Sequence, residues 1–191
     1  MPKRKDKIYE KTNSKTLSLL LSLAMLLGMV SMGSVPAFAD SNSSFAGGTG
    51  TKDDPYQIET PAQLENMKNY LSDSGKGVYF KLTHDIDSGN FTAIGDNNQH
   101  EFGGFFNGDG HYVSVGIAES DPCHFASSGL FRAVSETGEI DNLEVRGTAT
   151  GSCDIGELAG INRGTIINCS SSVKVTGGDN YQFTGGLVGV N

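Results

Sequence analysis

The chain has 191 residues, with 26 Gly and no Trp, and a formal net charge of −8. Acidic chains repel phosphate backbones and anionic lipid surfaces, which argues against nucleic-acid binding and against adhesion to a membrane. The Gly content is too low for collagen, and a chain of this length can bury a hydrophobic core.

The N-terminus has the features of a secretory signal peptide over residues 1–39. Basic residues precede an apolar run at 17–30, and Ala37 and Ala39 form a small-x-small cleavage site before Asp40. We expect cleavage after Ala39 and a secreted or cell-surface product that meets the membrane only during export. An uncleaved membrane anchor is the weaker alternative, because the apolar run is shorter than the ~20 residues that a membrane-spanning helix needs.

A polar leader at 40–46 is expected to be disordered, and one helix is predicted after it. Strands are expected at 56–58 and 78–82. Between them Thr60 and Gln63 form a capping box that starts a helix over 60–72. The apolar face of this helix contains Leu64, Met67 and Leu71. Beyond Asn90 the pattern indicates only short strands and turns.

The last sixty residues repeat internally. Leu130 aligns with Leu158 and Leu187, at spacings of 28 and 29 residues. Such a unit, with three short strands, cannot bury its apolar side alone, but stacked copies can. We therefore predict an all-β fold with one N-terminal capping helix, built as a parallel β-helix or solenoid. The competing architecture, a β-sandwich of hairpins, requires no fixed period.

Stacking of the repeats makes specific predictions. Equivalent side chains should form columns, namely Leu130 with Leu158 and Leu187, Ile140 with Ile166, and Leu143 with Cys169. Asn142 and Asn168 should stack as an amide ladder. The helix at 60–72 should cover the first open end, because an uncovered end exposes unpaired backbone groups.

The repeat residues carry a resemblance to a known family. The motif positions are Gly129, Leu130, Gly156, Leu158, Gly160, Asn162, Asn168, Gly186, Leu187, Gly189 and Asn191. In order and spacing they resemble the GLUG-motif repeats of secreted bacterial surface proteins, and the segments upstream resemble what precedes such repeats. The resemblance implies a right-handed β-helix with a capped N-terminus, used in adhesins and in non-catalytic parts of surface proteins. Arg132 departs from the motif, which has Gly there, so the first unit is expected to be distorted.

These observations suggest an organisation in four parts. A signal peptide at 1–39 and a leader at 40–46 precede the cap and first rungs at 47–128 and the GLUG-type repeats at 129–191. The third repeat is incomplete, and a solenoid usually needs three repeats, so we expect a fragment of a longer protein. The alternatives are that dimerisation covers the open edge or that a short chain suffices.

We predict no catalytic, cofactor or metal site. Asp85, Asp87 and Asp96 match positions 1, 3 and 12 of a calcium loop, but the glycine comes one position early and no flanking helices are evident. Asp109 and His111 are a weak candidate acid/base pair, because neighbouring turn residues rarely aim at one substrate atom.

The three cysteines have no metal-type spacing, and the sequence leaves open whether Cys123, Cys153 or Cys169 forms a disulfide.

The function that fits best is a non-catalytic extracellular β-helix module of a bacterial cell-surface or adhesin-like protein. It would present a binding or spacer surface, with a glycan or a protein as ligand. The alternative is a polysaccharide lyase or glycoside hydrolase on a β-helix scaffold, which rests on analogy of fold. Such an enzyme would need charged residues clustered on one face over several rungs, and residues 151–191 hold three acidic and two basic residues.

Overall fold

The computed structural model describes residues 44–95, 100–118, 127–151, 154–177 and 183–191, all within one compact unit, Ala39–Asn191. The predicted signal peptide and its cleavage site at Ala37, Ala39 and Asp40 lie outside the described residues. Asp96, Cys123 and Cys153 also lie outside them.

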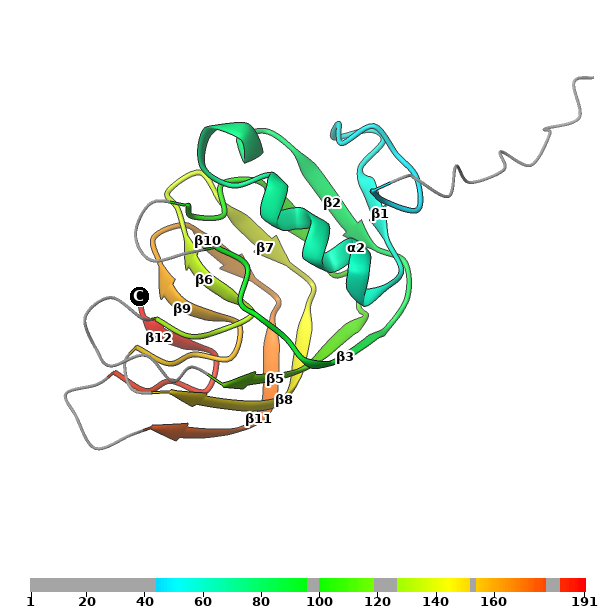
Figure 1. Ribbon diagram of the computed structural model, residues 1–191. Helices are drawn as coiled ribbons and strands as arrows, with labels where there is room; N and C mark the ends of the chain where they lie inside the picture. Colours follow the sequence, from blue (N-terminus) through cyan, green and yellow to red (C-terminus); the bar gives the residue numbers. More distant parts are fainter. Residues whose placement is uncertain (1–43, 96–99, 119–126, 152–153, 178–182) are drawn as a thin grey trace, which may run out of the picture. The chain divides into compact units, whose positions relative to one another are not determined.

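Three parallel sheets surround one core (Figure 1). Sheet A contains, in spatial order, β1 (Tyr56–Ile58), β2 (Tyr79–Leu82), β4 (Phe105–Asn107), β7 (Glu139–Asp141) and β10 (Thr165–Ile167). Sheet B contains β3 (Ile86–Asn90), β5 (Tyr112–Ala118), β8 (Glu144–Gly151) and β11 (Ser170–Gly177). Sheet C contains β6 (Phe131–Val134), β9 (Ala159–Asn162) and β12 (Val188–Val190). Successive turns of the chain, here called rungs, add one strand to each sheet, so the fold is the predicted parallel β-solenoid.

The register of the strands confirms the predicted columns. Ile140 pairs with Ile166 in parallel. Leu130 and Leu158 are fully buried, and the neighbouring residues Phe131 and Ala159 pair in the same way. Hairpins would pair in antiparallel fashion, so the β-sandwich alternative is wrong. Strand β6 pairs with β9 without a register shift, so Arg132 does not distort the first unit as the family pattern suggested.

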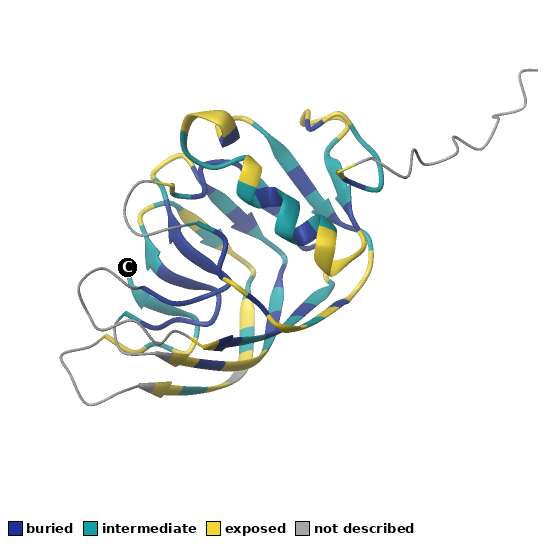
Figure 2. Cartoon of the chain, in the orientation of Figure 1, coloured by how far each residue is buried: buried dark blue, intermediate teal, exposed yellow. Residues whose placement is uncertain are grey.

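Buried residues alternate with partly exposed ones along β2, β4, β5 and β7 (Figure 2). In β5 the inward residues Val113, Val115 and Ile117 are buried, while the residues between them are partly exposed. Leu143 is buried and Cys169 packs against the core beside it, which confirms the third column. Burial raises the pKa of the Cys169 thiol, as expected of a cysteine that serves as a small apolar residue.

Helix α2 (Pro61–Asn66) closes the N-terminal side of the core. The predicted capping box is present: the Thr60 hydroxyl accepts the backbone N–H of Gln63 at 3.3 Å, and Gln63 Oε1 accepts the N–H of Thr60 at 3.2 Å. Leu64 and Met67 are fully buried, and the helix contacts β3, the edge strand of sheet B. The helix therefore covers this sheet edge, as predicted.

The helical segment is shorter than the predicted range 60–72. After α2 it continues as a 3-10 helix at Met67–Asn69 and ends at Tyr70, and a separate 3-10 helix follows at Ser72–Gly75. Tyr70 leaves the helical region with φ −123°, and Ser72 adopts φ 55°, which an α-helix does not tolerate. Leu71, expected on the helix face, still packs against the core from beyond the helix end.

The predicted disordered leader at 40–46 is wrong for its last residues. Phe45 is buried, and its ring stacks on Tyr56 at a centroid distance of 4.6 Å. The same ring contacts Tyr70 and Phe80, which extends the core toward the N-terminus. The N–H of Ala46 also donates to the carbonyl of Gln57. Burial of a large aromatic ring offsets the entropy cost of ordering this polar segment.

Left-handed residues form the corner between sheets A and B. Asn142 and Asn168 have φ values of 53° and 51°, a conformation that Asn tolerates better than most residues. The amide ladder predicted for them is wrong. Their side-chain amides donate instead to the two carboxylate oxygens of Asp141, at 2.8 and 3.2 Å. An ionised carboxylate is a stronger acceptor than a second amide.

Candidate functional site

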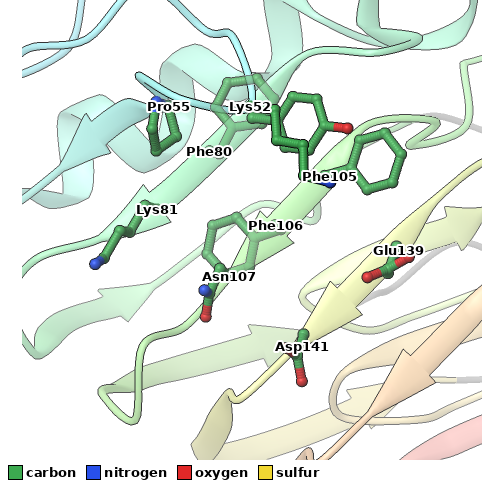
Figure 3. A pocket seen from close by; sticks show the side chains of 10 residues that line it. Lys52, Pro55, Phe80, Lys81, Phe105, Phe106, Asn107, Glu139 and Asp141 are labelled. Atoms are coloured by element: carbon green, nitrogen blue, oxygen red, sulfur yellow. The ribbon is translucent and has the colours of Figure 1, made fainter.

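A groove runs along the outer face of sheet A (Figure 3). Side chains alternate along a strand, so each of β2, β4 and β7 points two of them away from the core. The outward side chains in the groove are Tyr79, Lys81, Phe105, Asn107, Glu139 and Asp141. Lys52 and Pro55, from the loop before β1, complete a volume of about 230 Å³. We call this feature the sheet A groove.

Two aromatic rings stack along the sheet A groove. Tyr79 in β2 and Phe105 in β4 are paired residues of adjacent strands. Their rings are nearly parallel, at an interplanar angle of 5° and a centroid distance of 4.3 Å. Parallel in-register strands impose this arrangement, because equivalent side chains lie one strand spacing apart. Both rings remain partly exposed and form an apolar surface within the groove.

The second row of outward side chains contains Lys81, Asn107 and Asp141. Hydrogen bonds and one ion pair hold these side chains in place. Lys81 Nζ lies 2.9 Å from the carboxylate of Asp109. Asn107 Oδ1 accepts the backbone N–H of Asp109, so the amide nitrogen of Asn107 remains available as a donor. The two amides at the sheet corner hold the carboxylate of Asp141 in place. The groove therefore offers fixed donors and fixed acceptors beside its aromatic rings.

Glu139 and Asp141 bring two carboxylates into the groove (Figure 3). The two residues lie on the same face of β7. Glycosidases also use a pair of neighbouring carboxyl groups for catalysis. The sequence analysis missed this pair. The only signal is Glu-Ile-Asp alternation over three residues, which is equally typical of a solvated strand face.

Asp109 and His111, the weak candidate for an acid/base pair, do not pair with each other. His111 Nδ1 instead lies 3.0 Å from Asp85 Oδ1, and Asp109 pairs with Lys81. The backbone N–H of Tyr112 donates to the same oxygen of Asp85 and, together with His111, lowers the pKa of that carboxyl group. Because β3 and β5 are paired strands of sheet B, Asp85 meets the start of the next rung rather than its own turn.

The candidate calcium loop lies only partly within the structure, since Asp96 is not described. Among the described residues no group of three His, Cys, Asp or Glu side chains is placed to hold a metal ion.

Most glycines of the repeat motif lie where other atoms of the protein come too close to the backbone to leave room for a side chain. A Cβ atom on Gly129, Gly156, Gly160 or Gly189 would lie between 2.2 and 2.7 Å from an atom of a neighbouring segment. Gly186 is different, because a Cβ there would meet nothing within 4 Å. Leu187 packs against the core, and its carbonyl accepts the N–H of Leu158, which places it in the column with Leu130 and Leu158.

An amide contact does occur between repeats, at a different corner from the one predicted. The Asn162 side-chain N–H donates to Asn191 Oδ1 at 2.7 Å. Asn162 is the last residue of β9, and Asn191 follows β12. The motif residues that the structure describes thus shape corners and the core, and the groove is built from other positions.

Fold and groove together define a parallel β-solenoid with an outward-facing groove on one sheet. No protein-family model matches the chain. The chain is 38% identical over 147 residues to a protein of Evansella cellulosilytica named as a Gly-rich membrane protein, covering 71% of this chain and 16% of that protein. It is 31% identical over 154 residues to a halomucin of Haloquadratum walsbyi, covering 74% of this chain and 2% of that protein. The chain thus spans less than a fifth of the length of these relatives.

A solved structure from Bacteroides ovatus, named as an immunoglobulin A1 protease, aligns with a TM-score of 0.47 and 20% identity. The alignment covers 78% of this chain and 65% of that one. Within the described residues, no helix has the length and apolar character needed to cross a membrane.

Proposed function

We propose that this chain is a non-catalytic extracellular module of a bacterial cell-surface or adhesin-like protein, built from GLUG-type repeats and exported by its first 39 residues. The sheet A groove would be its binding surface. The observation that carries this proposal is the outward column of stacked rings and fixed polar groups over three consecutive rungs. Its similarity to much longer proteins, one of them named as a membrane protein, supports a role as one part of a larger molecule.

A glycoside hydrolase is the second candidate, and the presence of the Glu139 and Asp141 carboxylates in one groove favours it. Two features speak against it. The carboxylate of Asp141 accepts two side-chain amides, which leaves it fewer free lone pairs for a substrate or a water. Glu139 lies at the open surface of the sheet, where little excludes water from a reacting group.

Turnover of polysaccharides separates the two candidates. The chain from Asp40 onward would be incubated with neutral and acidic polysaccharides, and new reducing ends and unsaturated uronates would be measured. We expect no products above a blank. Products that disappear in both Glu139→Gln and Asp141→Asn, but persist in the matched sheet B variant Glu144→Gln, would establish the hydrolase instead.

Export is tested with the full chain. We expect mass spectrometry of the protein from a bacterial host to find Asp40 as the first residue, and protease added to whole cells or medium to digest the product. A product that keeps residues 1–39 and stays protected inside the cell would contradict the proposal.

A further inference from the structure

We propose that the sheet A groove binds a neutral oligosaccharide, with a sugar ring packed on the aromatic pair Tyr79 and Phe105 and its hydroxyls bonded to Asn107, Glu139 and Asp141. This inference rests on the proposed function, because it names the ligand class of the same surface.

The aromatic pair supplies the apolar half of a sugar site. Each ring has a negative face, and the axial C–H groups of a pyranose form a weakly positive, apolar surface that packs well on it. Tyr79 and Phe105 stack face to face, so each covers one face of the other, and the second face of Phe105 is on the side of Glu139, its pairing partner in β7. Strand pairing holds the ring in place, so a sugar packed on this face requires little ordering on binding. Aliphatic side chains at these positions would give the same buried area without the charge pattern.

The polar groups match the other half of a sugar. A hydroxyl both donates and accepts, so it is best bound where donors and acceptors alternate. Asn107 offers an amide N–H, while Glu139 and Asp141 offer carboxylate oxygens on the neighbouring strand (Figure 3). Because the corner amides already fix Asp141, its acceptor positions are set before the ligand arrives.

Charge selects a neutral ligand. The groove contains the carboxylates of Glu139 and Asp141, and Asp109 already neutralises Lys81, the nearest cation on the sheet. The chain also has a net charge of −8, so uronic acids, sulfated sugars and phosphates would be repelled. Lys52 is then the remaining groove cation, and one ammonium does not offset two carboxylates.

The size of the groove favours a short segment of glycan. Its volume of about 230 Å³ is just below the ~300 Å³ at which pockets for drug-sized ligands begin. One or two sugar rings would fill such a space, and the rest of a chain would extend along the exposed sheet. A protein partner would instead need a wide, flat contact of roughly 800 Å² on each side.

The test measures binding of neutral hexasaccharides by calorimetry, with cellohexaose, laminarihexaose, mannohexaose and chitohexaose as probes and a hexagalacturonate as the acidic comparison. We expect at least one neutral probe to bind and the hexagalacturonate to bind at least about tenfold more weakly. Phe105→Leu keeps an apolar side chain but removes the ring, and should weaken neutral binding about tenfold.

A matched control is Tyr112→Leu, which removes a partly exposed, outward aromatic ring from sheet B in the same rung. It should bind as the unchanged protein does, and Asn107→Ala gives a second groove variant if Phe105→Leu fails to fold. Binding of the acidic probe alone, no binding of any probe at millimolar concentration, or equal binding by the Phe105 and Tyr112 variants would overturn the inference. None of these outcomes involves turnover or location. The proposed function is tested by the turnover and export experiments, so its failure can be distinguished from failure of this inference.

Discussion

Glu157 carries a buried carboxyl group. Its side chain is fully buried, and neither carboxylate oxygen has a hydrogen-bond partner among the described residues. Burial raises the pKa of Glu157 to about 7. At neutral pH this residue is therefore poised between a neutral acid, which burial tolerates, and a charged form, which burial penalises.

The pH dependence of stability should report this residue. The pKa of Glu157 in the folded protein lies above the ordinary value of 4.5. The contribution of its neutral carboxyl group to the free energy of unfolding is therefore fully present below about pH 4.5 and is lost as the pH rises through 7. The loss amounts to at most about 3 kcal/mol. We expect Glu157→Gln to remove it, so that the difference in unfolding free energy from the unchanged protein varies between pH 5 and 8.5 in urea titrations.

The matched control is Glu136→Gln, because Glu136 is exposed. A constant difference for Glu157→Gln would mean that its carboxyl group titrates normally in the folded protein.

Asn168 should matter both for its backbone and for its amide. Its φ of 51° lies in the left-handed region, which Ala tolerates less well than Asn, so Asn168→Ala should cost about 1 kcal/mol. It also removes the bond to Asp141. Asn168→Gly keeps the backbone free and loses only that bond, so it should be the less destabilising of the two in urea unfolding. Asn69→Ala, at an exposed 3-10 helix position, is the control. Equal losses for Ala and Gly at position 168 would show that the left-handed corner carries no strain.

At the scale of elements, the capping box of α2 should be cooperative. Thr60→Ala should cost about 1 kcal/mol of stability, because it leaves the N–H of Gln63 without its acceptor. Gln63→Ala removes the reciprocal bond. The double variant should cost less than the two single changes together, since the two bonds support each other. Thermal unfolding of the four proteins measures this coupling, and strict additivity would contradict it.

At this scale, the features that could be predicted from the sequence are those that the internal repeat determines. The columns through Ile140 and Leu130 were predictable because the period fixes register and burial fixes direction. The end of the helix was not, since it depends on the backbone at Ser72. The sheet A groove was also missed. It is assembled from pairs of outward residues on strands of three or four residues that lie 26 to 60 positions apart along the chain, and such pairs carry no periodic signal.

At the scale of the whole molecule, the solenoid should be most stable at its centre. Strands β7, β8 and β9 have described partners on both sides, whereas β10, β11 and β12 have a described partner on one side only. Opening of a strand with one neighbour breaks fewer bonds. We expect amide hydrogens of the inner three strands to exchange at least about tenfold more slowly, measured by mass spectrometry after brief deuteration. Uniform protection across all six strands would indicate a single cooperative unit.

The parallel stacking also determines how the length and the outer face of the solenoid grow with the number of residues. The strands of sheet A, from residue 56 to residue 167, advance by four strand spacings, or about 19 Å. An α-helix of the same number of residues would reach about 170 Å. A solenoid therefore extends far less per residue than an α-helix does. Each further turn instead widens a continuous outer face by one more row of side chains, and a long array would offer many equivalent contacts, each weak, to a ligand that itself repeats.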